Sequence, residues 1–230
     1  PFYIRDLGVT DINQVTLWAG ILSALGAGAM ALTAPIWGVL ADRHGRKLMV
    51  QRATFGGAIV LGSMAFVTNV QQLAVLRLLQ GTLTGTVSAF MVLVATIAPP
   101  SQVGFSLGIM QMAVFTGASV GPLVGGLIAD RLGYRAVFVV TGVLLLVGGL
   151  LALAMIRENF VRPEGKRSNG LLDGARTIRR TAPVLGAIGV LAFSALGNAF
   201  PSPVLPLLVE SLQSAASRVN TATGLVYGAS

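Results

Sequence analysis

The sequence comprises 230 residues, of which 54% are hydrophobic and only 10% are charged, and this balance excludes an ordinary soluble domain. Its formal net charge of +8 could indicate nucleic-acid binding, but the basic residues gather at the ends of apolar runs without interleaved aromatic residues, so we expect lipid headgroups as partners and no nucleic acid. With no cysteine and a single histidine, the chain offers neither a disulfide framework nor a cysteine or histidine metal cluster.

Long apolar runs predict an all-α membrane protein, because each run could cross the roughly 30 Å hydrocarbon core of a bilayer as one helix. The sequence starts at what we interpret as the outer end of a first helix, and both of its ends look cut, so we expect a segment of a longer protein. The next five helices are expected at about residues 15–41, 48–67, 73–98, 103–129 and 136–156. Residues 1–156 would then form an amino-terminal six-helix bundle whose first helix is truncated.

The composition changes abruptly after this bundle. Residues 157–180 hold seven Arg and Lys residues against three acids, which predicts a basic linker over 157–182. A seventh helix is expected at about residues 183–212, and an eighth begins near Thr221, so residues 183–230 would start a second bundle. A faint echo of residues 1–7 in residues 206–212 supports this boundary, although chance similarity between apolar segments also explains it.

A short polar island joins the second and third helices. Its glycines would permit a sharp turn and close backbone approach, and its acid could pair with an arginine or a helix N-terminus. A basic anchor that only orients the protein is the alternative, but it requires neither the spaced glycines nor the acid. The island residues are Gly38, Asp42, Arg43, Gly45, Arg46 and Lys47.

Orientation follows from the tendency of basic residues to stay in the cytoplasm. If the island and the linker share one side of the membrane, that side carries eleven basic residues against four on the other. We therefore expect the island and the linker in the cytoplasm, and the turns after the third and fifth helices outside.

The pattern of the island returns in degraded form at residues 126–135, which lie 88 positions further on. A glycine, an acid, a base, a second glycine and a second base stand in register in the two copies. Because three spans intervene, the copies would lie on opposite sides of the membrane. This is the sequence pattern of an inverted three-helix repeat, which is typical of alternating-access transporters.

A charged residue lies inside the fourth predicted helix. Arg77 is expected about one turn from the outer end of that helix, and Gln80 and Gly81 follow it at helical spacing. A charge within the membrane costs roughly 2.5–3.5 kcal/mol on insertion scales and normally faces a cavity or a partner. The alternative is that the long side chain of Arg77 reaches the outer headgroups.

The fifth predicted helix carries a run of small residues around a proline. Glycines four residues apart share one helix face and form a flat groove, while a proline removes a backbone hydrogen bond and bends the helix. A generic packing face is the alternative. The run comprises Gly117, Gly121, Pro122, Gly125 and Gly126.

Together with the basic linker, these motifs resemble the major facilitator superfamily in order and spacing. The island resembles the loop motif between helices two and three, and Arg77, Gln80 and Gly81 resemble the R-x-x-Q-G motif of helix four. The run around Pro122 closely resembles the helix-five motif of drug:proton antiporters, whereas Leu83 stands where the family often has a second glycine. The resemblance covers the whole chain and implies a twelve-helix fold of two six-helix bundles related by a pseudo-twofold axis, here only partly covered.

The resemblance further implies export of small amphipathic molecules by proton antiport with alternating access. The island would be a conformational latch, the Arg77 motif would couple protons or substrate, and the run around Pro122 would be the pivot between the two halves. We expect a monomeric, multi-pass protein of the plasma membrane, specifically the bacterial inner membrane. No acid lies in the interior of a predicted span, so the proton-carrying acid is expected outside this segment.

Substrate-cavity residues are nominated from the helices that line the pathway in this family. Aromatic, methionine and amide side chains suit a cavity for varied lipophilic molecules, although helix packing or lipid contact is the alternative for each of them. The nominated residues are Phe90, Met91, Gln111, Met112, Phe115, Asn198 and Phe200.

Other function classes are weaker interpretations of the sequence. An enzyme is not expected, because no grouped nucleophile, base and acid, metal cluster or phosphate loop is present, and we expect no cofactor. A metabolite or sugar exporter on the same scaffold and a transport-inactive membrane receptor or scaffold are the alternatives to drug export.

Overall fold

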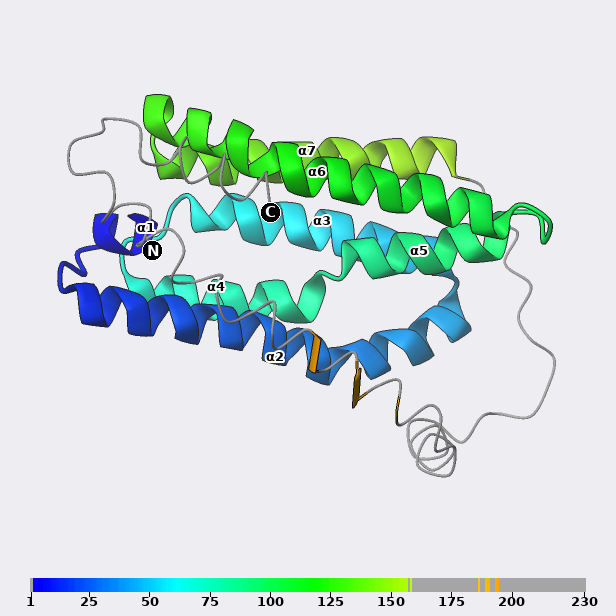
Figure 1. Cartoon of the computed structure of the whole chain (residues 1–230), viewed down its shortest axis with the longest axis horizontal. Helices are drawn as coiled ribbons and strands as arrows, with labels where there is room; N and C mark the ends of the chain where they lie inside the picture. Colours follow the sequence, from blue (N-terminus) through cyan, green and yellow to red (C-terminus); the bar gives the residue numbers. More distant parts are fainter. Residues whose placement is uncertain (1, 157, 159–185, 187–188, 191–192, 195–230) are drawn as a thin grey trace.

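The computed structural model describes residues 2–156, 158, 186, 189–190 and 193–194 (Figure 1). All regular structure within these residues is helical, which agrees with the predicted all-α class. The helices are α1 (Phe2–Asp6), α2 (Ile12–His44), α3 (Arg46–Met64), α4 (Val70–Leu83), α5 (Thr86–Ile97), α6 (Val103–Leu132) and α7 (Tyr134–Met155). Apart from a few single residues, the predicted linker, the seventh helix and the start of the eighth lie outside the described residues.

Four described segments are long and apolar enough to cross a membrane: Ile12–His44, Val70–Ile97, Val103–Leu132 and Tyr134–Met155. The third predicted span, now α3, is not among them. Its first two turns carry Arg46, Lys47, Gln51 and Arg52, which lower its hydropathy. It nevertheless has more buried residues than any other described helix, so α3 is an enclosed element of the bundle.

The island is not the loop that the sequence predicts. α2 continues to His44 and α3 begins at Arg46, so Gly45 alone joins the two helices. Gly45 has φ +93°, a conformation that residues with a side chain rarely adopt, and this lets the chain reverse direction within one residue. Asp42 and Arg43 therefore lie on the last turn of α2.

The fourth predicted helix is not continuous either. α4 ends at Leu83 and α5 begins at Thr86, with Gly85 in the left-handed region at φ +96°. We call Thr84 and Gly85 the joint. α4 contacts α2 and α3, whereas α5 contacts α3 and α6, so the joint carries the second half of this span towards α6. The change of course is visible in Figure 1.

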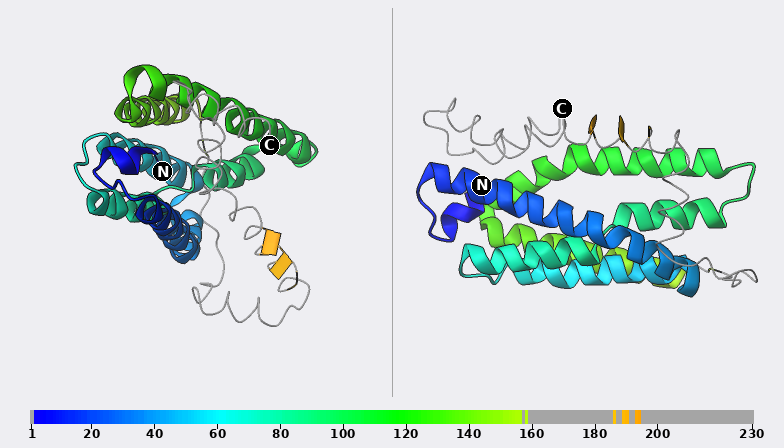
Figure 2. Two further views of the ribbon diagram at one scale, coloured as in Figure 1. Left: turned by 60° about the vertical axis from the view of Figure 1, so that its left-hand side comes forward. Right: turned by 90° about the horizontal axis from the view of Figure 1, so that it is seen from below.

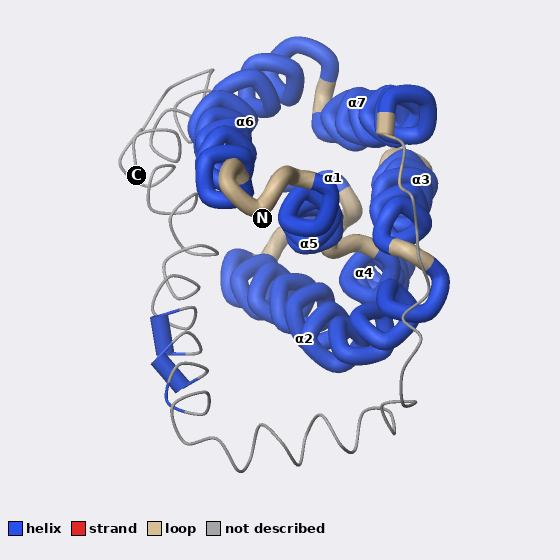
Figure 3. The backbone as a smooth tube through the Cα atoms, turned by 90° about the vertical axis from the view of Figure 1, so that its right-hand side faces the viewer, coloured by secondary structure: helices blue, strands red, loops and turns tan. Residues whose placement is uncertain are grey.

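The helices lie side by side along one common direction (Figures 1 and 2). Seen end-on, the other helices stand around α5, which contacts α3 and α6 (Figure 3). The α3–α7 crossing is close because it uses glycine: a Cβ atom at Gly142 would lie 3.0 Å from the carbonyl oxygen of Ala58, and one at Gly149 would lie 2.8 Å from Oγ1 of Thr54. Small residues allow such close packing inside membranes, where the hydrophobic effect does not drive helices together.

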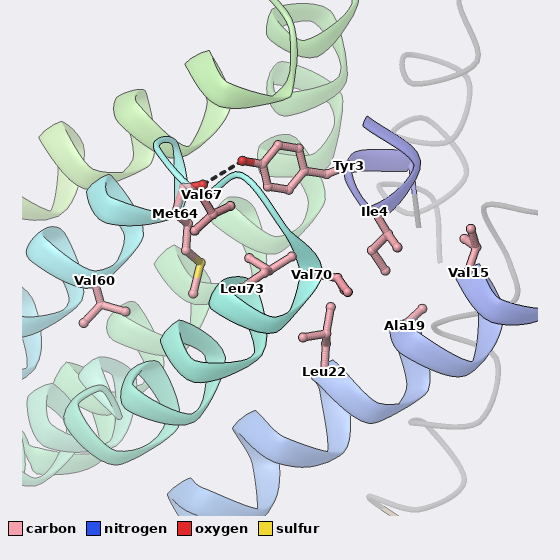
Figure 4. Close-up of a cluster of buried hydrophobic side chains, with 10 residues drawn as sticks. All are labelled: Tyr3, Ile4, Val15, Ala19, Leu22, Val60, Met64, Val67, Val70 and Leu73. Carbon is pink, nitrogen blue, oxygen red and sulfur yellow. Dashed lines mark hydrogen bonds between the residues drawn. The ribbon is translucent and has the colours of Figure 1, made fainter. Parts of the chain in front are cut away.

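The largest apolar cluster ties α1 to the neighbouring helices (Figure 4). The buried Tyr3 hydroxyl donates a 2.8 Å hydrogen bond to the carbonyl oxygen of Met64 at the end of α3. The Tyr3 ring also lies 5.0 Å from the ring of Phe138 on α7, measured between centroids. α1 thus packs into the bundle through Tyr3.

Candidate functional site

The island residues connect three helices at one end of the bundle. The Arg46 guanidinium Nη2 lies 3.4 Å from Oδ1 of Asp42 across the Gly45 junction, and its Nη1 donates a 2.8 Å hydrogen bond to Oγ1 of Thr96 on α5. The Asp42 side chain is 68% exposed and that of Arg46 is 32% exposed, so this ion pair faces outward. The two residues of such a pair can readily take other partners, because an exposed ion pair contributes only about 0–1 kcal/mol to stability.

Glu158 belongs to this end of the bundle, although sequence reasoning assigned it only to the linker. Its two carboxylate oxygens accept hydrogen bonds from the backbone N–H groups of Arg46, at 2.9 Å, and Lys47, at 2.7 Å. The residue before them, Gly45, has no side chain with which to cap α3. A carboxylate at a helix N-terminus both satisfies free N–H groups and complements the helix dipole.

Lys47 makes the reciprocal contact. Its ammonium Nζ donates a 2.9 Å hydrogen bond to the carbonyl oxygen of Leu153 in the last turn of α7. The start of α3 and the end of α7 are therefore held together by bonds in both directions. The contacts join residues more than 100 positions apart, so no local sequence signal could reveal them.

The island and its echo lie at opposite ends of the bundle, as the sequence predicts. While Lys47 reaches the last turn of α7, Nη2 of Arg135 near the start of α7 lies 3.5 Å from the carbonyl oxygen of Val67, just beyond α3. The two helix junctions also share their geometry. Gly133 alone joins α6 to α7 with φ +82°, and its N–H bonds Ala129 O at 2.9 Å, as that of Gly45 bonds Ala41 O at 3.0 Å.

The Arg77 motif lies on the inner part of α4. Because α4 begins at Val70, Arg77 stands about two turns from the helix start, not one as predicted. Its Nη1 donates a 3.0 Å hydrogen bond to Oε1 of Gln80, and its Nε is buried with no hydrogen-bond partner in the described part of the chain. The two polar residues of the motif thus form a unit, and one donor of the guanidinium is left over.

Gly81, the third residue of this motif, has a packing role. A Cβ atom there would clash with the carbonyl oxygen of Gly26 and would lie 2.9 Å from Cβ of Ala29. No side chain fits at this crossing, so Gly81 sets the distance between α2 and α4. The coupling role expected for it has no support in these contacts.

The run around Pro122 divides between two surfaces of α6. Gly126 is buried, and a Cβ atom at Gly125 would lie 3.9 Å from Cγ1 of Val137 on α7. Gly117 and Gly121 are exposed, and a Cβ atom at either would meet no described atom within 4 Å. α6 continues through Pro122 from Val103 to Leu132.

The nominated cavity residues do not come together in one place. Phe90 packs against the core cluster of Val50, Leu93 and Ala152, as its packing alternative anticipated. Met91, also on α5, is partly buried. The α6 residues Gln111, Met112 and Phe115 line one shallow groove, in which Met112 and Phe115 are each 64% exposed. Asn198 and Phe200 lie outside the described residues.

A more enclosed cavity of about 310 Å³ lies between α2, α3, α4 and α5. Two of its lining residues, Trp37 and Arg52, were not nominated from the sequence. Gly38, Asp42 and Arg46 line it from the island side, and Trp37 and Arg52 line it deeper in the bundle. The Arg52 guanidinium carbon lies 3.6 Å from the centroid of the Trp37 ring. The only sequence signal for this pair was Arg52 itself, a charged residue that follows Arg46 and Lys47 and lies in the predicted third helix.

Comparison with known proteins gives one consistent result. The family model described as Major Facilitator Superfamily matches residues 1–230. The chain is 33% identical over 226 residues to a protein of Salmonella paratyphi A named multidrug resistance protein MdtG, covering 98% of this chain and 56% of the relative. It is 31% identical over 226 residues to a protein of the same name in Proteus mirabilis, with the same coverage. The chain thus spans little more than half the length of these relatives.

Proposed function

Because the chain belongs to the major facilitator superfamily, we propose that it is part of a transporter that exports small amphipathic molecules by proton antiport with alternating access. The membrane-length helices and the family make it part of a multi-pass membrane transporter. The name of its relatives, multidrug resistance protein, favours drug-like substrates. The bacterial relatives favour the inner membrane, with the island and the linker on the cytoplasmic side.

The single observation that carries this proposal is the pair of matched one-residue junctions at opposite ends of the bundle. Gly45 and Gly133 share a positive φ and an N–H bond to the alanine four residues earlier. Repeats of inverted topology let a transporter form two equivalent closures around one central site. The island junction would close the cytoplasmic side, and its echo belongs to the opposite side.

We assign the motif residues proposed roles from their contacts and exposure. Asp42 and Arg46 form an exposed pair that can exchange partners, which suits a latch that holds one state of the cycle. Arg77 keeps an unpaired buried donor beside Gln80, which suits interaction with a proton-linked or substrate-linked negative charge. Gly117 and Gly121 present an open glycine face on α6, which suits the sliding contact between two halves.

The test is transport by the purified protein in liposomes with an imposed proton gradient. A fluorescent amphipathic dye is expected to accumulate in vesicles that are acidic inside, and nigericin, which collapses the gradient, is expected to abolish this accumulation. Dye flux that ignores the gradient would contradict antiport. Flux of sugars or metabolites without dye flux would support the alternative of a metabolite or sugar exporter. No flux of any substrate would indicate a transport-inactive receptor or scaffold.

A further inference from the structure

The joint in the fourth span is held by side chains from two other helices. A helix end leaves backbone carbonyl groups without partners inside the helix. The indole Nε1 of Trp37 on α2 donates a 2.7 Å hydrogen bond to the carbonyl oxygen of Thr82, and Nη2 of Arg52 on α3 donates one of 3.2 Å to that of Thr84. Thr82 lies in the last turn of α4 and Thr84 is the residue that follows this helix, so the interruption is supported by specific contacts.

Trp37 and Arg52 also support one another. The guanidinium stacks on the indole ring at 3.6 Å, a cation–π arrangement for which arginine and tryptophan are well suited. We call these two side chains the clamp. The clamp connects α2, α3 and the joint. It brings together Trp37, Arg52 and Thr84, which lie far apart in the sequence.

The clamp leaves part of its hydrogen-bonding capacity unused. Nε and Nη1 of Arg52 are both buried, and neither has a hydrogen-bond partner among the residues that the structure describes. A buried donor without a partner is costly, so native structures rarely keep one without a reason. An arginine held in this way stabilises the joint only weakly and can release it.

Space for movement lies next to the joint. Thr84, Gly85 and Ser88 line the same cavity of about 310 Å³ as the clamp residues. This cavity is only partly enclosed, so a helix segment beside it meets fewer packed side chains than it would in a close-packed interior and has room to shift. The segments on either side also have different neighbours, because α4 packs on α2 and α5 contacts α6.

We infer that Trp37 and Arg52 are positioning residues that hold the fourth span in its interrupted form, and that transport requires the clamp to release so that the span can straighten. This inference rests on the proposed transport function for its second part. The first part, control of helix geometry by the clamp, stands independently of what the protein transports. Asp42 and Arg46 line the same cavity, so release of the clamp would alter the surroundings of this proposed latch pair.

Distance measurement between spin labels across the joint tests the clamp in the purified protein. Labels at Val75 on α4 and Ile97 on α5 suit this purpose, because these side chains are 60% and 47% exposed. In an uninterrupted helix the two Cα atoms would be about 33 Å apart, at about 1.5 Å per residue. The unmodified protein is expected to depart from this distance.

Trp37→Phe removes the N–H donor but keeps an aromatic ring, and Arg52→Met removes the guanidinium. Both are expected to shift the distance distribution towards that of the uninterrupted helix. Gly85→Ala is expected to do the same, because a side chain disfavours φ +96°. Arg52→Lys keeps the charge without the stacking plane and should fall between the unmodified protein and Arg52→Met.

Trp18→Phe is the matched control, since Trp18 lies on the same helix and packs against the core cluster away from the joint. It should leave the distances unchanged. Unchanged distances in both Trp37→Phe and Arg52→Met would overturn the clamp, whatever the transport result. Shifted distances with an unchanged transport rate would overturn the requirement for release, and an unmodified protein that transports nothing would refute the proposed function instead.

Discussion

Asp42, which we propose as part of the latch, contributes little to the stability of the fold. Its carboxylate is 68% exposed and pairs with Arg46 at 3.4 Å, a contact worth about 0–1 kcal/mol. Asp42→Asn should therefore leave membrane insertion and the midpoint of thermal unfolding nearly unchanged while it abolishes export. Dye transport in vesicles and thermal unfolding of the same preparation measure the two effects.

Asp6→Asn is the control for this prediction, because Asp6 is an exposed carboxylate at the end of the bundle distant from the island. It should transport normally. Export at the unmodified rate by Asp42→Asn would show that Asp42 is no latch, and a large fall in thermal stability would show that its role is structural.

Glu158 makes the opposite kind of contribution at the same end of the bundle. It caps the two N–H groups that begin α3, and loss of a helix cap typically costs about 1 kcal/mol. Glu158→Ala is expected to lower the free energy of unfolding by about that amount, since the bonds lose their acceptor. Glu158→Gln keeps one acceptor oxygen without the charge, so its loss should be smaller.

Thermal unfolding in detergent micelles, followed by tryptophan fluorescence, measures this effect. An alanine variant as stable as the unmodified protein would mean that water caps α3 equally well. A glutamine variant as unstable as the alanine variant would mean that one acceptor oxygen is not enough, and that the cap needs both carboxylate oxygens and their negative charge.

At the scale of elements, the glycines of α6 and α7 differ in their surroundings, although both helices are apolar and rich in glycine. A Cβ atom at Gly142 on α7 would press against the backbone of Ala58 and Gly62, at 3.0 and 3.2 Å. One at Gly121 on α6 would meet no described atom within 4 Å. The first glycine serves the packing of this bundle, and the second lies on the open face that we propose for the contact between halves.

Matched substitutions separate these roles. Gly142→Ala should destabilise the protein by about 1–3 kcal/mol, the usual cost of overpacking, as measured by thermal unfolding. Gly121→Ala should change stability less but slow export, because it thickens the proposed sliding face. Equal loss of stability in both variants would contradict the assignment of Gly121 to the pivot, as would normal export by Gly121→Ala.

At the scale of the whole molecule, the inverted arrangement of the two junctions makes a prediction about sidedness. Arg43 and Arg131 are both exposed and lie at opposite ends of the bundle, and the chain contains no cysteine of its own. In intact cells, a membrane-impermeant maleimide should label Arg131→Cys, whereas Arg43→Cys should react only after the membrane is permeabilised. Labelling of both variants from the same side would contradict the proposed alternating-access geometry.

The amino-acid sequence by itself determined the helical class, the family and the approximate course of the spans, because apolar length and spaced glycines act locally. It also predicted that the island and its echo lie at opposite ends, since the number of intervening spans fixes this. Residues such as Gly45 were identified correctly as turn formers, but the length of the turn was not, because charged residues can continue a helix that emerges from the membrane.

Only the tertiary structure decided where helix four is interrupted, what caps α3, and which glycines face an open surface. Each of these depends on contacts between distant residues: Trp37 with Thr82, Arg52 with Thr84, and Glu158 with Lys47. A backbone carbonyl or N–H group can accept a partner from any neighbouring helix, so its choice is fixed by packing and not by local sequence. The joint, which we propose to move, is held by two such contacts between residues that are far apart in the sequence.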